Sequence, residues 1–249
     1  MNDASSLPPT ALPTVGFNEV PARAHPLLDE LRGQFDFGVH RWQVGAYALL
    51  VAAVACSDRL LDELAELPQQ HPRVRDERMP YWADIWPSSR ALAEWIARRP
   101  DDLTGQHVLE IGCGQGLPGV VAGLRGAAVT LSDYEKAALA FAQLNWQLNL
   151  DTPASTLCLD WRNPPEATFD LLLAADVAYE ARSFEPLVGT FQQCLRPGGR
   201  VWLAEPQRPV AVDFFRLLRA NGFEIETETT EVSAPGSRGC IDLHEIRRA

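Results

Sequence analysis

The stretch Val108-Leu-Glu-Ile-Gly-Cys-Gly-Gln-Gly-Leu-Pro-Gly119 decides the fold of this chain, together with Val129-Thr-Leu-Ser-Asp133 downstream. The first stretch predicts a strand and a glycine turn that opens a helix, and the second predicts a strand that ends on an acid. This pattern is half of a nucleotide-binding βαβ unit. Gly112, Gly114 and Gly116 have no Cβ atom, so the backbone can approach a ligand closely. Asp133 stands where a carboxylate can accept hydrogen bonds from both hydroxyls of a ribose.

Glu110 discriminates between the ligands that such a turn could take. The spacing Gly114-x-Gly116-x-x-Gly119 matches the dinucleotide fingerprint, but a dinucleotide would bring two phosphates next to the Glu110 carboxylate. S-adenosylmethionine has no phosphate, and its methionyl end carries an ammonium and a sulfonium, which suit a carboxylate. The pattern therefore favours S-adenosylmethionine over NAD or FAD.

Composition narrows the class of protein. The chain has 249 residues, of which 46% are hydrophobic, and a formal net charge of −11. That charge argues against nucleic-acid binding, which needs clustered lysine and arginine, and it suits solubility or a basic partner. No apolar run reaches the length of a membrane span, and the N-terminus has no signal-peptide pattern. The five cysteines and five histidines show neither metal spacing nor a disulfide framework, so we expect reduced thiols and a cytoplasmic location. We also expect a monomer that does not contact membranes.

The order of the predicted elements gives an α/β fold. Residues 1–24 are rich in proline, serine and alanine and predict a disordered tail. Residues 25–80 predict an N-terminal extension made of a β-hairpin and a helix. Strands and helices alternate over residues 81–249, which predicts a doubly wound, mostly parallel, seven-stranded sheet of the Rossmann-like type. The last two β-prone pieces, residues 223–232 and 241–247, predict an antiparallel hairpin at the edge.

The predicted strand ends carry the candidate site. Ligands of such a sheet bind outside the carboxyl ends of the strands. Acids and a tryptophan gather there more densely than packing requires, besides the glycine turn: Asp133, Asp160, Trp161, Ala175, Asp176 and Glu205.

Taken together, residues 80–249 resemble the seven-β-strand S-adenosylmethionine-dependent methyltransferases. Glu110-x-Gly-x-Gly-x-Gly116 is similar to the first motif of that fold, and Ser132-Asp133 is similar to the end of its second strand. Leu195-Arg-Pro-Gly-Gly199 is similar to its late loop. Finer features resemble the branch that holds the nicotinamide N-methyltransferase-like proteins and the protein-lysine methyltransferases.

The resemblance to this branch implies roles for single residues. Asp176-Val-Ala-Tyr179 is similar to its Asp-x-x-Tyr motif, which makes Asp176 and Tyr179 the candidate catalytic residues. Residues 81–87 and 205–209 are similar to segments of the electron-transfer-flavoprotein β-subunit lysine methyltransferases, although that family usually has Asp where Glu205 stands. No metal is implied. The implied cofactor-binding residues include a tryptophan beside the cofactor and an Asp-Trp pair at the adenine: Trp86, Glu110, Gly112, Cys113, Gly114, Gly116, Asp133, Asp160, Trp161 and Ala175.

Each of these residues also has a packing alternative. Trp86 and Trp161 could be core aromatics, Asp176 could cap the turn that follows it, and Tyr179 could cover the end of the sheet. Cys113 lies inside the glycine turn, where a small side chain fits, and we do not interpret it as a nucleophile.

The resemblance implies N-methylation of a protein lysine. A small-molecule amine remains open as the alternative acceptor, and a non-catalytic or dinucleotide-binding protein is a third reading. The sulfonium is already a good leaving group, so catalysis depends mainly on alignment and electrostatics. A lysine must first lose its proton, from a pKa of about 10.4. We expect Asp176 to orient the amine and Tyr179 to form one wall of its slot.

Overall fold

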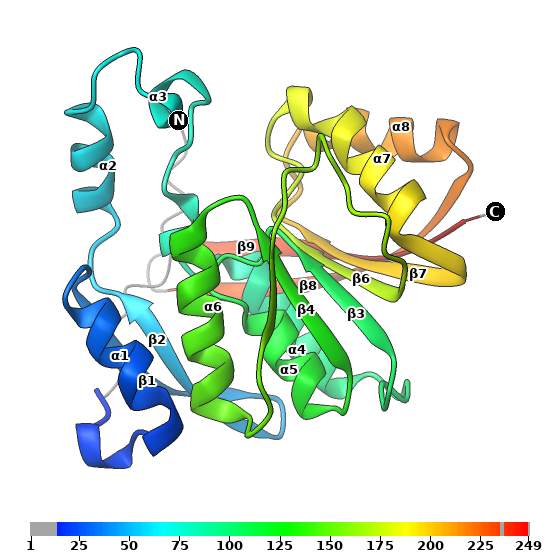
Figure 1. Cartoon of the computed structure of the whole chain (residues 1–249). Helices are drawn as coiled ribbons and strands as arrows, with labels where there is room; N and C mark the ends of the chain where they lie inside the picture. The colour runs from blue at the N-terminus through cyan, green and yellow to red at the C-terminus, as the bar shows by residue number, and fades with distance from the viewer. Residues whose placement is uncertain (1–13, 235–236, 249) are drawn as a thin grey trace.

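The computed structural model describes residues 14–234 and 237–248, and its centre is one large sheet (Figure 1). The strand order in this sheet is β5-β4-β3-β6-β7-β9-β8. Neighbouring strands in the first part of that order run parallel: β5 (Ser155–Cys158), β4 (Ala128–Asp133), β3 (His107–Ile111), β6 (Phe169–Ala175) and β7 (Leu195–Glu205). β8 (Phe223–Ala234) and β9 (Ser237–Arg248) form an antiparallel hairpin, and β9 pairs antiparallel with β7. The predicted α/β class, with its mostly parallel seven-stranded sheet and antiparallel C-terminal hairpin, is confirmed.

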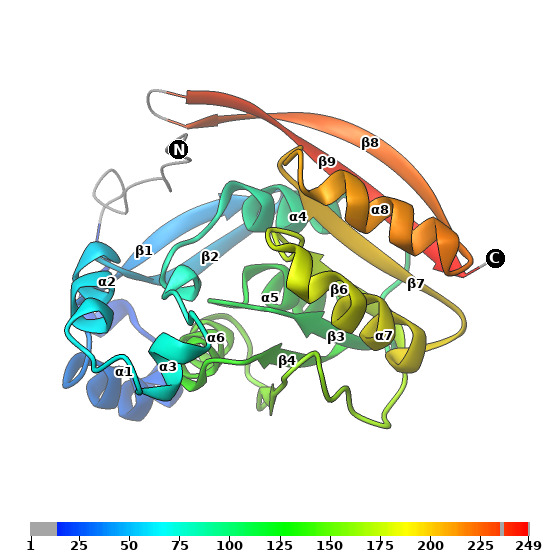
Figure 2. The same ribbon diagram turned by 90° about the horizontal axis from the view of Figure 1, so that it is seen from above.

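The central strands are apolar because helices cover both faces of the sheet. Leu171, Leu172 and Leu173 of β6 are fully buried, and the only charged side chain that is buried within β3 is Glu110. α4 (Pro87–Arg98), α5 (Leu117–Leu124) and α6 (Lys136–Asn149) lie on one face, and α7 (Phe184–Cys194) and α8 (Ala211–Ala220) lie on the other (Figures 1 and 2). The sheet is therefore doubly wound, as predicted.

The N-terminal extension packs against α6, beside the main sheet (Figure 2). It consists of α1 (His25–Arg32), the hairpin β1 (Phe37–Val44) and β2 (Tyr47–Val54), α2 (Asp58–Ala65) and the short α3 (Pro72–Arg75). Asn145 and Asn149 stand one turn apart on α6 and bind the backbone of β2, accepting from the N–H groups of Ala52 at 2.7 Å and Leu50 at 2.9 Å. Two side chains of a helix thus satisfy backbone groups that a neighbouring strand would otherwise bind. The predicted hairpin and helix extension is confirmed.

The predicted tail differs from the structure in its second half. Residues 1–13 lie outside the described residues, but Val15, Val20 and Ala24 are buried in the cluster that also contains residues of α1, β1 and α6. The prediction of disorder for residues 14–24 is therefore wrong. Although the stretch is rich in proline, its few apolar side chains pack into this cluster. Since the extension and α6 share this cluster, a division of the chain at residue 80 stays a proposal. None of the helices in residues 14–234 and 237–248 is long and apolar enough to cross a bilayer.

Candidate active site

The predicted site residues come together at the carboxyl ends of the parallel strands. The glycine turn follows β3, Asp133 ends β4, Ala175 ends β6 and Glu205 ends β7. Because these strands run parallel in the order β4-β3-β6-β7, their carboxyl ends share one rim of the sheet. This rim is where ligands of doubly wound sheets bind.

The glycine turn between β3 and α5 requires glycine for its backbone shape. Gly112, Gly114 and Gly116 have φ values of +60°, +50° and +76°, in the left-handed region that favours glycine. A Cβ atom on Gly116 would also lie 2.9 Å from the Cβ of Ala142 in α6. Gly116 therefore serves helix packing, in addition to the close approach to a ligand that we predicted for the turn.

Asp133 is held against this turn by two backbone donors. Its Oδ2 accepts from the N–H of Gly114 at 2.9 Å, and its Oδ1 accepts from the N–H of Glu135 at 2.9 Å. Burial raises the pKa of Asp133 to about 6, although both hydrogen bonds lower it. The side chain is half-buried. Each carboxylate oxygen can accept a second hydrogen bond, so this geometry suits the predicted ribose-binding role.

The Glu110 carboxylate is buried beneath the glycine turn. It is only 2% exposed and accepts from the N–H of Gly119, in the first turn of α5, at 2.9 Å. A Cβ atom on Gly119 would come within 2.4 Å of Glu110 Oε2, so this contact depends on glycine. The predicted contact between Glu110 and the cations of the methionyl end stays a prediction, and it would have to share the carboxylate with the Gly119 N–H. Alternation along β3 turns Glu110 toward the helix layer, where burial raises the pKa of its carboxyl to about 8.

Replacement of Glu110 by glutamine should flatten the pH dependence of stability. Because the pKa of Glu110 is raised in the folded protein, its neutral form is favoured by folding. That stabilisation is complete below the usual value of 4.5 and is lost as the pH rises through about 8. We expect the wild type to lose up to about 4 kcal/mol of unfolding free energy from this group between pH 5 and 9, at about 1.36 kcal/mol per pK unit, and Glu110→Gln to lose less.

Denaturant unfolding across this pH range measures the effect. Glu94→Gln is the matched control, because Glu94 is partly exposed and pairs with Arg90 one turn away. Parallel pH profiles for the wild type and both variants would show that Glu110 is ionised in the folded protein.

Trp161 and Cys113, two other predicted cofactor residues, differ in whether their side chains could reach a ligand at the turn. Trp161 lies against the turn, since a Cβ atom on Gly112 would be 3.2 Å from its indole. The Cys113 side chain is buried in the core, and burial raises the pKa of its thiol well above the usual 9.0. Cys113 can therefore reach a ligand only through its backbone, and its protonated thiol does not suit a nucleophile.

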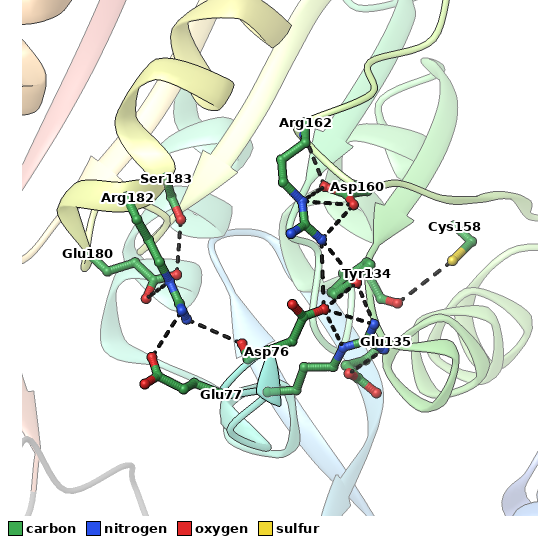
Figure 3. A network of polar contacts seen from close by, with 11 residues as sticks. Asp76, Glu77, Tyr134, Glu135, Cys158, Asp160, Arg162, Glu180, Arg182 and Ser183 are labelled. Carbon is green, nitrogen blue, oxygen red and sulfur yellow. Dashed lines mark hydrogen bonds and ion pairs between the residues drawn. The ribbon is translucent and has the colours of Figure 1, made fainter. Parts of the chain in front are cut away.

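Asp160 is paired with an arginine rather than left open for an adenine (Figure 3). Arg162 donates from Nε to both carboxylate oxygens of Asp160, at 2.8 and 3.0 Å. The predicted adenine contact of this side chain would have to compete with that ion pair. Sequence reasoning did not foresee the pairing, although Arg162 stands only two residues away.

A segment of the N-terminal extension, to which the sequence assigned no role in the site, borders the same rim. In the 76–78 segment (residues 76–78, after α3), Asp76 accepts from the hydroxyl of Tyr134 at 2.8 Å. The Arg78 guanidinium lies 3.9 Å from the centre of the Tyr134 ring. On the other side, Glu77 is paired with Arg182 at 2.9 Å (Figure 3). The 76–78 segment is thus tied to the loop after β4 and to the loop after β6.

Asp176 follows β6 in a backbone conformation that is uncommon for aspartate. Its φ is +62°, and its N–H donates to the carbonyl of Ala204 in β7 at 2.9 Å. Its side chain is 7% exposed; Oδ1 accepts from Nη1 of Arg208 and Oδ2 accepts from the hydroxyl of Ser88 at 3.4 Å. In the described part of the chain, the carboxylate therefore bonds to side chains of other elements, which disfavours the turn-cap alternative.

Arg208 also joins Asp176 to Glu205. The backbone N–H of Arg208 donates to both carboxylate oxygens of Glu205, at 3.1 and 3.0 Å. Burial raises the pKa of Glu205 to about 7. Arg208 and Ser88 were not assigned from the sequence, and only the similarity of the 205–209 segment drew attention to the first of them.

Three aromatic side chains form an aromatic rim, defined here as Tyr81, Trp86 and Tyr179. The ring centres of Tyr81 and Tyr179 are 5.7 Å apart, and those of Tyr81 and Trp86 are 6.0 Å apart, both edge to face. Tyr81 is 44% exposed and Tyr179 is 39% exposed. Partial burial and the charges of Glu180 and Asp133 raise the pKa of Tyr179 to about 12, so its hydroxyl stays neutral. The Trp86 indole donates to the carbonyl of Tyr81 at 2.8 Å, which gives it a structural contact within this rim.

Comparison with known proteins agrees with this geometry. A family model described as lysine methyltransferase matches residues 76–221. EEF1A lysine methyltransferase 3 of Mus musculus is 29% identical over 153 residues, which cover 58% of this chain and 65% of that protein. The electron transfer flavoprotein beta subunit lysine methyltransferase of Rattus norvegicus is 32% identical over 132 residues, 52% of each chain. The chain thus spans about half to two thirds of the length of these relatives.

A solved structure shares the fold. Magnesium protoporphyrin IX methyltransferase from Synechocystis, with bound SAM, superposes with a TM-score of 0.54 at 20% identity. The match covers 77% of this chain and 92% of that one. At this identity the likeness concerns the architecture, a Rossmann-like sheet of the methyltransferase type.

Proposed function

This chain belongs to the lysine methyltransferase family, and we propose that it transfers a methyl group from S-adenosylmethionine to the side-chain nitrogen of a lysine in a protein. The observation that carries the proposal is the position of Asp176 and Tyr179. Both follow β6 at the rim, within the residues that the family model matches. A carboxylate beside an open aromatic wall is what an amine acceptor needs.

The cofactor would bind along the rim between β3 and β4. When bound, S-adenosylmethionine supplies an activated methyl group on a sulfonium. The turn of Gly112, Gly114 and Gly116 would form the floor of its site, Asp133 would bind the ribose hydroxyls, and Trp161 would line the site. These roles are supported by the contact between Gly114 and Asp133 and by the position of Trp161 against Gly112.

The residues of this chain would act on the acceptor by orientation. Asp176 would accept a hydrogen bond from the amine and direct its lone pair at the methyl group. Tyr179, neutral at working pH, would form a wall of the slot and offer its ring face to the cationic product. No group of three histidine, cysteine or acidic side chains that could hold a metal occurs in residues 14–234 and 237–248.

The openness of the aromatic rim favours a protein acceptor over a small amine. Tyr81 and Tyr179 leave large parts of their rings accessible, which suits a lysine presented on the surface of a large molecule. A small amine would instead need enclosure to be bound tightly. The net charge of −11 also suits a basic partner surface. A monomeric state, a cytoplasmic location, and the absence of nucleic-acid and membrane partners stay predictions.

Mass spectrometry of proteins from cells with and without this chain tests the proposal. We expect a methyl-lysine that disappears on deletion, returns with the wild type and does not return with Asp176→Asn. Label from the methyl donor that appears only in small amines would move the assignment to the small-molecule alternative. Calorimetric binding of NAD without binding of S-adenosylmethionine would contradict the whole assignment.

A further inference from the structure

We infer that Arg208 is a positioning residue for methyl transfer, which cancels the charge of Asp176 and holds one of its carboxylate oxygens so that the other faces the incoming amine. This inference rests on the proposed function. In it, the Arg208 guanidinium is the group that allows the Asp176 carboxylate to stand next to a neutral amine.

Arg208 is fixed in place by the loop after β7. Its backbone N–H is held by both oxygens of Glu205, which is itself 2% exposed. The preceding residue, Gln207, has a φ of +58° and donates from its side chain to Asp242 of β9 at 2.9 Å. This turn directs the Arg208 guanidinium onto Oδ1 of Asp176, 32 residues earlier in the chain.

A carboxylate without this partner would work against the reaction. A negative charge beside a lysine favours the ammonium form, which has no lone pair to attack the methyl group. The paired guanidinium cancels that charge while the carboxylate keeps its capacity to accept a hydrogen bond. The lone pair of the neutral amine can then form the new N–C bond. The C–S bond of the donor breaks with its electrons going to sulfur, which leaves a neutral thioether and a methylated ammonium. The proton that the lysine lost before the attack goes to solvent.

The second oxygen of Asp176 is held less tightly than the first. Its contact with the Ser88 hydroxyl, at 3.4 Å, is long for an O–H···O hydrogen bond. Ser88 stands in the first turn of α4, whose N-terminal end favours a negative charge. Oδ1, in contrast, accepts a hydrogen bond from the Arg208 guanidinium. The asymmetry between the two oxygens is what assigns one to Arg208 and the other to the amine.

The other titratable groups near this pair determine how it can be tested. Glu205 and the more distant Asp242 approach from β7 and β9, and Tyr81 approaches from the turn before α4. Burial raises the pKa of Glu205 to about 7, so Glu205 changes charge near neutral pH. The pH profile should therefore be recorded above pH 8, which is above the pKa of Glu205 in the wild type.

The test measures initial rates of label transfer from saturating S-adenosylmethionine to proteins of an extract from deletion cells, between pH 8 and 10.5. We expect Arg208→Gln to be at least about tenfold slower at pH 8, with its rate profile displaced upward by about one pH unit, since the acceptor lysine would hold its proton more tightly. Arg208→Lys keeps the charge, so its profile should stay in the wild-type position although its rate is lower. Arg216→Gln is the matched control, because Arg216 is exposed on α8 and pairs with Asp213 of the same helix.

A double variant shows whether Arg208 affects the rate through Asp176 or independently of it. Asp176→Asn combined with Arg208→Gln should be no slower than Asp176→Asn alone, because Arg208 acts through that carboxylate. An equal loss of rate at every pH in Arg208→Gln, with the profile unmoved, would overturn the inference and leave Arg208 a structural role. If Arg208→Gln does not fold, a displaced profile in Arg208→Lys would overturn it instead. Wild-type protein that labels no lysine at any pH would refute the proposed function itself, and this inference with it.

Discussion

Replacement of Asp176 by asparagine should slow methyl transfer by about 100-fold or more, while S-adenosylmethionine still binds. Asparagine tolerates the left-handed backbone that Asp176 adopts, at a φ of +62°, so the variant should fold. Its neutral amide loses the ion pair with Arg208 and can turn its NH₂ group toward the amine. A misplaced acceptor group of this kind costs on the order of 10² in rate.

The variant Asp133→Ala should lose cofactor affinity, whereas Asp176→Asn should lose the rate of methyl transfer. The side chain binds the turn through the Gly114 N–H and is the predicted ribose ligand. We expect its loss to weaken cofactor affinity by about ten- to a hundredfold, because hydrogen bonds to charged groups are worth roughly 1.5–3 kcal/mol. Calorimetry with the cofactor and single-turnover rates with the labelled protein separate the two variants. Near-normal turnover in Asp176→Asn would show that Asp176 is structural and would remove it from the catalytic assignment.

Replacement of Gly114 by valine should abolish cofactor binding. A β-branched residue at a φ of +50° is strained, by about 1–3 kcal/mol, and the turn would relax by moving its N–H away from Asp133. The glycine turn and the Asp133 carboxylate would then both leave the positions in which they are proposed to bind the cofactor. We expect the affinity for S-adenosylmethionine to fall by more than about 100-fold, since two of the proposed contacts to the cofactor are disturbed together.

Gly105→Val is the control for this strain. Gly105 also has a positive φ, of +72°, and a Cβ atom there would meet nothing within 4 Å. It precedes β3, at the end of the strand opposite the rim. Both variants should lose stability in thermal unfolding, but only Gly114→Val should lose cofactor affinity in calorimetry. Equal loss of affinity in both variants would mean that general destabilisation explains the effect.

The candidate site was predictable where its residues follow strand ends. The apolar run and glycine turn of residues 107–116 predict β3 and its turn, and the rim positions of Asp133 and Asp176 follow from the parallel order. Resemblance to a family motif singled out Tyr179, which the structure places next to Tyr81. Leu195-Arg-Pro-Gly-Gly199 looks like a loop, and the structure places it at the start of β7. Leu195 pairs with Phe169 and Arg200 pairs with Leu171, so the residues between Leu195 and Arg200 bulge out of the pairing. Local composition could not show that pairing.

The sequence by itself determined the α/β class and the rim on which the candidate site lies, because both follow from local patterns: apolar strands, the glycine turn and the alternation of strand and helix. Only the tertiary structure decided which charges meet. Alternation along β3 places Glu110 on one face, but the helix packed there decides that it binds Gly119. Arg208 meets Asp176, and the 76–78 segment meets Tyr134 and Arg182, because the fold brings distant loops to one rim. Ion pairs between residues far apart in the chain depend on that spatial arrangement, which no local pattern encodes.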